Sequence, residues 1–100
     1  MTLPIRIGSL ASAELTEAVR WYESKHRGLG GELLDEVTKP IDRLSSNPET
    51  GRPMSADQNT RRLLVSRFPY HLVYHIRPAE IVLVAVAHLK RRPGYWKNRM

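Results

Sequence analysis

Six side chains in the second half of the sequence belong to types that can cleave RNA without a metal ion. Such a reaction needs a base for the 2′-hydroxyl proton, an acid for the leaving oxygen, and cations that stabilise the phosphorane. The suitable residues are His71, His75, His88, Lys90, Arg91 and Tyr95. Because the chain has no lysine between Lys39 and Lys90, candidate bases are few. The residue types therefore permit phosphodiester cleavage but support it poorly.

The histidines are unsuited to hold a metal ion. His71 and His75 share one face of a predicted strand, but four residues along a strand span roughly 13 Å. The chain has no cysteine, and Asp57 and Glu80 are the acidic residues near these histidines. We therefore expect two half-exposed strand histidines, with no metal and no cofactor. His88 follows an apolar segment and is expected to be a hydrogen-bonded structural residue.

Positive charge is concentrated toward the C-terminus. The chain carries 16 Lys and Arg against 10 Asp and Glu, a net charge of +6. Residues 1–50 hold 6 basic and 8 acidic side chains, whereas residues 51–100 hold 10 and 2. This asymmetry favours an acidic or polyanionic partner. The predicted target-binding residues are Lys90, Arg91, Arg92, Tyr95 and Trp96, although the two aromatic side chains could instead hold the tail against a sheet.

Two amphipathic helices should precede this basic half. The first is expected from Ser12, as N-cap, to the glycines after His26, with Glu14 in its first turn. Its apolar stripe is Leu15, Ala18, Val19 and Tyr22, with Trp21 at the edge. The second is expected over residues 31–46, with Leu33, Leu34, Val37, Ile41 and Leu44 on one face. Pro40 should kink this second helix.

Four strands are predicted, over residues 3–7, 60–66, 70–77 and 81–89, and residues 47–59 should be an exposed loop. The unbroken apolar run at 81–87 indicates a strand buried on both faces, so the first strand should lie beside the last. The order predicts a two-layer α+β fold: an N-terminal strand, a helical hairpin, and a three-stranded antiparallel meander (β-α-α-β-β-β). A chain of 100 residues should form a single domain over 1–100.

Several protein classes are excluded by composition. The absence of cysteine excludes disulfide scaffolds, Cys-ligated metal centres and thiol nucleophiles. No apolar run approaches the roughly 20 residues that a membrane span needs. The first residues do not have the pattern of a signal peptide. We therefore expect a cytoplasmic protein without a membrane partner.

Several segments together resemble the RelE/ParE superfamily of bacterial toxins. They are Arg61-Arg62-Leu63-Leu64-Val65, Phe68-Pro69-Tyr70, Leu72-Val73-Tyr74-His75-Ile76 and Ile81–His88, closing on Arg91-Arg92-Pro93-Gly94-Tyr95-Trp96. Ala18-Val19-Arg20-Trp21-Tyr22 and Gly28-Leu29-Gly30 resemble the first helix of that superfamily and the turn after it. The resemblance covers nearly the whole chain. It implies the toxin of a type II toxin–antitoxin pair, which stabilises a plasmid or genome and is held inactive by a cognate antitoxin.

The superfamily has two branches. One cleaves mRNA in the ribosomal A site, whereas the ParE branch poisons DNA gyrase and is not known as a nuclease. The ending H-x-x-R-x-P-x-Y-W resembles the ParE branch; it is formed by His88, Arg91, Pro93, Tyr95 and Trp96. The resemblance thus implies inhibition of gyrase, and so of replication, by binding and without catalytic residues. The alternative is a ribosome-dependent mRNA endonuclease, whose catalytic residues would be His88, Lys90, Arg91 and Tyr95.

The implied antitoxin is a ribbon-helix-helix protein of the ParD kind, through which alone the toxin would reach operator DNA. A groove between two helices can receive a partner helix on apolar anchors. Trp21, at the edge of the apolar stripe, is the expected rim residue. The predicted antitoxin contacts are Trp21, Arg61, Arg67 and Arg77.

Overall fold

The protein is described here from a computed structural model, in which residues 2–54 and 58–99 are described. Its elements are β1 (Ile5–Ile7), α1 (Ser9–Lys25), α2 (Leu29–Leu44), β2 (Arg52–Pro53), β3 (Thr60–Leu64), β4 (Tyr70–Ile76) and β5 (Ile81–His88). Short 3-10 turns lie at Pro48–Thr50 and Lys97–Arg99. The sheet has the order β1-β5-β4-β3-β2, in which β1 is parallel to β5 and the other pairs are antiparallel. The predicted α+β class, with the first strand beside the last, is confirmed.

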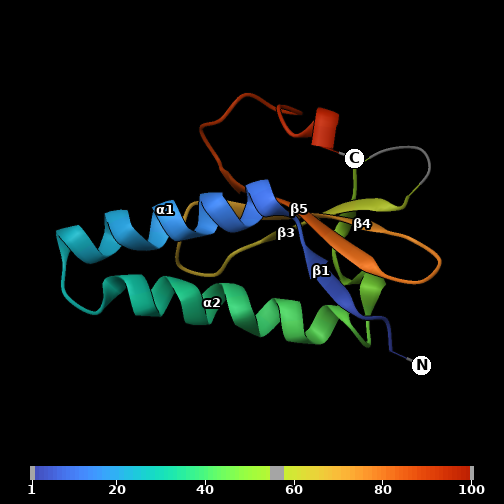
Figure 1. The fold of residues 1–100 in the computed structure, drawn as a ribbon, viewed down its shortest axis with the longest axis horizontal. Coiled ribbons are helices and arrows are strands. Elements are labelled where there is room, and N and C mark those ends of the chain that lie inside the picture. The colour runs from blue at the N-terminus through green and yellow to red at the C-terminus, as the bar shows by residue number, and fades with distance from the viewer. Residues whose placement is uncertain (1, 55–57, 100) are drawn as a thin grey trace.

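The two helices form one layer and the sheet forms the other. Figure 1 shows α1 and α2 side by side and antiparallel, with both chain ends at the same end of the molecule. Leu33, Val37 and Leu44 of α2 are at most 1% exposed and Ile41 packs against the same core, so the predicted apolar stripe faces the sheet except at Leu34. The prediction was wrong for Leu34, which is 44% exposed. Their cluster includes Leu72, Tyr74, Leu83 and Val86 on the strands. Every residue of β5 from 81 to 87 is buried, which confirms the prediction of burial on both faces.

The opposite face of the sheet has a second, smaller core. Val73, Val82, Val84, Ala85 and Ala87 pack there beneath the indole of Trp96. Trp96 is 5% exposed, because the tail returns across this face after it passes α1 (Figure 1). The expectation that a tail aromatic residue could hold the tail against the sheet is confirmed for Trp96.

The helix boundaries differ from the predicted ones. α1 begins at Ser9, and the carbonyl of Gly8 accepts the N–H of Ser12 at 2.9 Å, so Ser12 is not the N-cap. The N-cap is Gly8, whose backbone is extended and which has no side chain to cap the helix. The sequence therefore has no polar capping residue at the true start of α1. α2 begins at Leu29 because Gly28 adopts a left-handed conformation (φ 89°) that glycine tolerates best. α2 continues through Pro40 and ends at Leu44.

The segment predicted as an exposed loop, residues 47–59, contains the short strand β2, and that prediction was wrong in this part. Arg52 lies opposite Arg62, and Pro53 lies opposite Arg61. Residues 55–57, which include Asp57, lie outside the described residues. Proline is tolerated here because β2 is an edge strand, where a missing N–H costs no ladder bond.

Candidate functional site

The C-terminal tail, residues 89–99, is fastened to the rest of the molecule by Glu14. This carboxylate on α1 accepts hydrogen bonds from the guanidinium of Arg99 at 2.8 and 3.2 Å, and from the hydroxyl of Tyr95 at 2.6 Å. It also accepts the backbone N–H of Val86 on β5 at 3.1 Å. The side chains of Glu14 and Arg99 are each 17% exposed, so little water competes with these contacts. Glu14 therefore joins helix, sheet and tail.

These contacts lie along the edge of β5 that extends beyond its pairing with β1. β1 pairs with β5 at residues 81–83, and beyond that point the described residues place no strand on this side of β5, while β4 continues along the other side. The carbonyl of Val84 accepts from Arg99 at 3.2 Å, while the N–H of Val86 donates to Glu14. The ion pair thus satisfies backbone groups that an open strand edge would leave unpaired. Burial raises the pKa of Glu14, but its hydrogen bonds and the charge of Arg99 outweigh burial and hold the pKa below 4.5.

Two guanidinium groups contact the ring of Tyr95. Arg91 lies 4.0 Å and Arg99 lies 5.0 Å from the ring centroid, which are cation–π distances. Burial raises the pKa of Tyr95, and the hydrogen bond to Glu14 raises it further, to about 12. At neutral pH the hydroxyl is therefore a hydrogen-bond donor that cannot act as a base.

The phenol of Tyr95 is expected to ionise near pH 12 instead of near pH 10. Because folding raises this pKa, the contribution of the protonated phenol to stability is complete below pH 10 and is lost as the pH rises from 10 toward 12. Ultraviolet difference titration of the wild type and of Tyr95→Phe, subtracted from each other, isolates this group. Ionisation of Tyr95 near pH 10 in the folded protein would show that the bond to Glu14 does not form.

His88 faces the helices because β5 contains a bulge. Val73 lies opposite Ala85 and Tyr74 lies opposite Leu83, which leaves Val84 without a partner across the ladder. The extra residue shifts the alternation, so the residues after it change faces. The ring of His88 meets Tyr70 edge to face at 5.1 Å, and its Nδ1 accepts the N–H of Lys90 at 3.0 Å. The expected hydrogen bond of His88 is present, and its role as a structural residue stays a prediction.

A groove of about 340 Å³ opens between α1, the end of β5 and the start of the tail. Its lining includes Glu17, Trp21, Tyr22, Tyr70, His88 and Arg91. Edge-to-face contacts link Trp21 to Tyr22 at 4.9 Å and Tyr22 to Tyr70 at 6.3 Å. An aromatic floor between a carboxylate and a guanidinium can bind a partner segment that carries both apolar and charged side chains.

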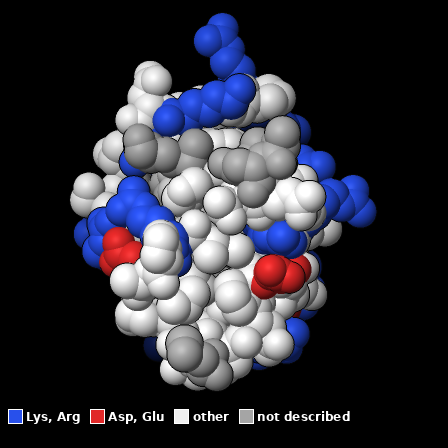
Figure 2. Space-filling view, turned by 90° about the vertical axis from the view of Figure 1, so that its right-hand side faces the viewer, with Lys and Arg blue, Asp and Glu red and all other residues white. Residues whose placement is uncertain are grey.

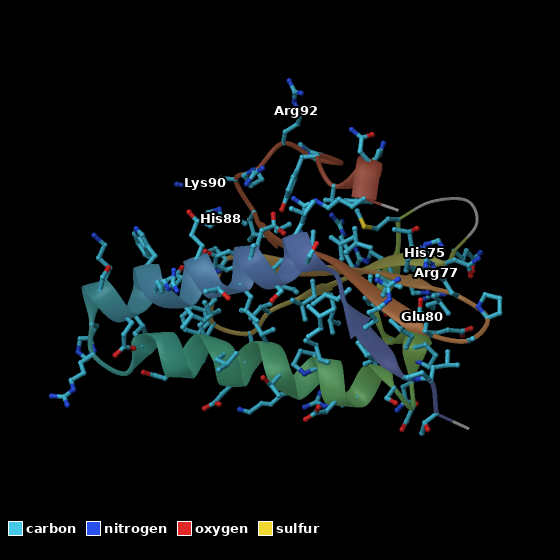
Figure 3. The ribbon with its side chains drawn as sticks, viewed as in Figure 1. His75, Arg77, Glu80, His88, Lys90 and Arg92 are labelled. Carbon is cyan, nitrogen blue, oxygen red and sulfur yellow. The ribbon has the colours of Figure 1, made fainter. Side chains whose placement is uncertain are left out.

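The predicted target-binding residues divide between exposed and packed positions. Lys90, Arg91 and Arg92 are exposed, and Figure 3 shows Lys90 and Arg92 pointing away from the body of the molecule near His88. Tyr95 is half-buried against Glu14, and Trp96 is buried. The structure thus brings the three cations together on the surface and uses the two aromatic residues to hold them there.

The predicted antitoxin-binding residues do not form one cluster. Trp21 is 55% exposed at the groove. Arg67 is exposed, pairs with Glu32 at 2.7 Å and lies over the ring of the buried Phe68. Arg77 lies at the turn between β4 and β5, together with His75 and Glu80 in Figure 3. Their role in binding an antitoxin stays a prediction.

Arg61 is placed inside the protein and differs from the other three. It is 8% exposed, and its guanidinium donates to the carbonyls of Gln58, Glu49 and Gly51 at 2.8 to 3.1 Å. A buried guanidinium with three carbonyl partners fixes the loop that carries them. This geometry favours a structural role for Arg61.

Glu14 is the residue of this site that sequence reasoning missed. Its expected position in the first helical turn was wrong, since α1 begins at Ser9. Its partner Arg99 is 85 positions away, so no local spacing relates them. The surplus of positive charge in the tail was a visible signal, but it did not indicate which carboxylate lies beneath it.

Neither a metal centre nor a membrane helix is found in the described part of the chain. Over residues 2–54 and 58–99, no group of three or more His, Asp or Glu side chains is arranged to hold a metal ion. His71 and His75 are half-exposed, as predicted. Within the same residues no helix has the length and apolar character needed to cross a bilayer.

Comparisons with known proteins agree with this architecture. The family described as ParE toxin of type II toxin-antitoxin system, parDE, matches residues 5–93. Among solved structures, a chain of the chromosomal ParDE TA system from P. aeruginosa is similar with a TM-score of 0.74 and 17% sequence identity, over 89% of this chain and 98% of that one. At this identity the likeness concerns the fold. A search of curated proteins finds no match.

The family match runs from β1 to Pro93, so it includes both helices, the whole sheet and the cations Lys90, Arg91 and Arg92. Tyr95, Trp96 and the rest of the tail lie beyond it. Because the matched region spans most of the sequence and the fold agrees independently, the chain belongs to the ParE toxin family of type II toxin–antitoxin systems.

Proposed function

We propose that this ParE-type toxin inhibits DNA gyrase in the cytoplasm, and so blocks replication, by binding through the cations at the start of its tail. The proposal rests on the fixed position of that tail. Glu14, Tyr95 and Arg99 hold it against α1 and β5, while Lys90, Arg91 and Arg92 remain exposed. A preorganised cationic surface loses less entropy on binding than a free tail would.

The geometry supports binding over RNA cleavage. Nδ1 of His88 is occupied by the N–H of Lys90. The phenol of Tyr95 is a donor to Glu14 with a pKa raised to about 12. Among the candidate nuclease residues, His88 and Tyr95 are side chains that could exchange a proton with a substrate. The Nδ1 atom of His88 and the hydroxyl of Tyr95 are engaged by the chain itself, which supports a toxin that acts as a binding protein.

Purified toxin tested in parallel on gyrase and on translating ribosomes separates the two mechanisms. We expect lost supercoiling or trapped gyrase–DNA cleavage complexes, and no cleavage of a ribosome-bound message. Arg91→Gln combined with Arg92→Gln should weaken the inhibition by at least about tenfold. Arg20→Gln combined with Arg43→Gln, which removes two exposed charges from the helices, is the matched control. Cleavage of the message by folded toxin, with gyrase unaffected, would overturn the proposal.

We further propose that a ribbon-helix-helix antitoxin neutralises the toxin by covering the groove at α1. The groove combines an exposed indole, an aromatic floor and charges of both signs, which suits a partner segment with an apolar stripe. Covering it would also place the partner against Arg91, which lines the groove and belongs to the proposed gyrase-binding cations. Antitoxin and gyrase would then compete for one residue.

Trp21→Ala is expected to weaken antitoxin binding by about tenfold or more while lowering the free energy of unfolding by less than about 1 kcal/mol. The indole is 55% exposed, so its loss removes little core packing. Leu10→Ala is the matched control, because Leu10 lies on the same helix, is 54% exposed and does not line the groove. Titration calorimetry with the purified antitoxin and urea unfolding measure the two quantities. Equal affinities for the antitoxin in both variants would contradict the groove as the docking site.

A further inference from the structure

Two arginines and a histidine meet on the face of the sheet that turns away from the helices. Arg52 on β2 lies directly opposite Arg62 on β3. Arg62 lies opposite Val73, which belongs to the core on this face, and His71 on β4 is one step diagonal to Arg62. Residues directly opposite in an antiparallel pair point to the same side, so all three share this face.

This arrangement carries an electrostatic cost that the protein does not relieve internally. Like charges directly opposite each other on neighbouring strands are destabilising. Among the described residues, the acidic partners of the ion pairs contact Arg6, Lys39, Arg67, Arg77 and Arg99, and none contacts Arg52 or Arg62. Burial lowers the pKa of His71, and the charge of Arg62 lowers it further. The imidazole can thus be a neutral donor beside two fixed cations.

The position of Arg52 is fixed by buried groups. The hydroxyl of Tyr74, which is fully buried, accepts the N–H of Gly51 at 2.8 Å and donates to the carbonyl of Pro48 at 2.7 Å. The buried guanidinium of Arg61 donates to the carbonyl of Gly51 at 2.8 Å. A Cβ at position 51 would lie 2.5 Å from that hydroxyl, so the segment fits only with glycine there. Arg52 is therefore held against Arg62 by a rigid support.

The three side chains line one open cavity of about 360 Å³, whose wall also includes Leu63, Leu64 and Thr50. Leu64 is 62% exposed, which gives the cavity an apolar neighbour to its cations. Figure 2 shows the end of the molecule with the β4–β5 turn, where Lys and Arg gather around an uncharged centre. The cavity lies toward the other end of β4, where His71 is opposite Leu64, and none of its lining residues is acidic.

We propose that Arg52, Arg62 and His71 form a binding site for the phosphodiester backbone of nucleic acid. Paired guanidinium groups match the oxygens of a phosphate, and a neutral imidazole adds a third donor. A nucleotide also brings an apolar sugar edge and base for Leu64, which a free phosphate ion does not. The site is separate from the tail cations and does not depend on the gyrase proposal.

The test is the binding of fluorescently labelled duplex DNA, single-stranded DNA and single-stranded RNA of one length, measured by anisotropy. Arg52→Gln combined with Arg62→Gln should weaken binding by about tenfold and reduce the slope of log K against log salt by about 2. Arg20→Gln combined with Arg43→Gln removes the same charge from exposed helix positions and should leave the slope nearly unchanged. The three probes show which nucleic acid carries the preferred phosphodiester.

Stability provides a second readout. Because the two arginines repel each other, their replacement by glutamine should leave the thermal midpoint unchanged or raise it. Equal weakening by both double variants would overturn the proposal, since net charge alone would then explain the binding. A lower midpoint in Arg52→Gln and Arg62→Gln would also count against it, because the arginines would then be structural.

A polyglutamate peptide that competes fully with nucleic acid would assign the site to an acidic protein instead. Loss of gyrase inhibition with intact nucleic-acid binding would affect the gyrase proposal alone.

Discussion

Glu14→Ala is expected to release the C-terminal tail and to lower the free energy of unfolding by about 2–4 kcal/mol. The substitution removes the acceptor of four hydrogen bonds at once. It leaves the guanidinium of Arg99, which is 17% exposed, without a carboxylate and the N–H of Val86 without a partner. Leaving charged and backbone donors unsatisfied costs more than the bonds are worth when they are formed.

Two measurements separate destabilisation from release of the tail. Urea unfolding gives the change in stability. Fluorescence of Trp96 reports the tail, because this indole is 5% exposed and should shift to longer wavelength when the tail leaves the sheet. Trp21→Phe serves as the common background, so that Trp96 is the remaining tryptophan. Glu17→Ala, one turn along the same helix and without a tail contact, should change the stability by less than about 0.5 kcal/mol.

The consequence for function follows from the position of the cations. Lys90, Arg91 and Arg92 lie between the end of β5 and the residues that Glu14 holds. If the tail is released, these cations lose their fixed arrangement, and inhibition of gyrase should fall with it. A Glu14→Ala protein that remains folded, keeps Trp96 buried and inhibits gyrase as well as the wild type would show that the tail is held by Trp96 alone.

The fold was predictable where sequence periodicity reflects burial. The stripe with Leu33, Val37 and Leu44 is apolar at helical spacing, and all three residues are at most 1% exposed. β2 was not predictable, because it consists of only Arg52 and Pro53 and so shows no alternation of apolar and polar side chains. The two residues join the sheet by pairing with Arg62 and Arg61 of β3. The residue before them, Gly51, is held by the hydroxyl of Tyr74 and the guanidinium of Arg61, which come from other strands. Tertiary contacts of this kind leave no trace in the local pattern.

The site was predictable only in part for a similar reason. The tail cations can be recognised in the sequence as a run of basic residues. The resemblance to toxins led to the prediction that they bind the target. The bulge at Val84 could not be predicted from the sequence, because the residues of β5 around it are all apolar and buried on both faces, so a change of face alters no pattern. That bulge places His88 on the side of the groove. The pairing of Glu14 with Arg99 connects the two ends of the chain and depends on the folded sheet.

Gly30→Ala is expected to lower the free energy of unfolding by about 2–3 kcal/mol, whereas Gly31→Ala should be neutral or stabilise by up to about 1 kcal/mol. A Cβ on Gly30 would lie 2.6 Å from the carbonyl oxygen of Val19, which belongs to the backbone of α1. A backbone atom cannot yield without moving the helix. No heavy atom lies within 4 Å of the corresponding position at Gly31, and alanine is the better helix former.

This pair of neighbouring glycines tests how the helices set the groove. Gly30 also donates its N–H to Glu23 of α1 at 3.0 Å, so the first turn of α2 is tied closely to the end of α1. Forcing the helices apart would move α1, which carries both Glu14 and Trp21, relative to the sheet. Gly30→Ala should therefore weaken antitoxin binding as well as stability, while Gly31→Ala should preserve both. Urea unfolding and calorimetry on the two variants measure this, and equal stability of the two would mean that the close approach of α1 and α2 does not fix the position of α1.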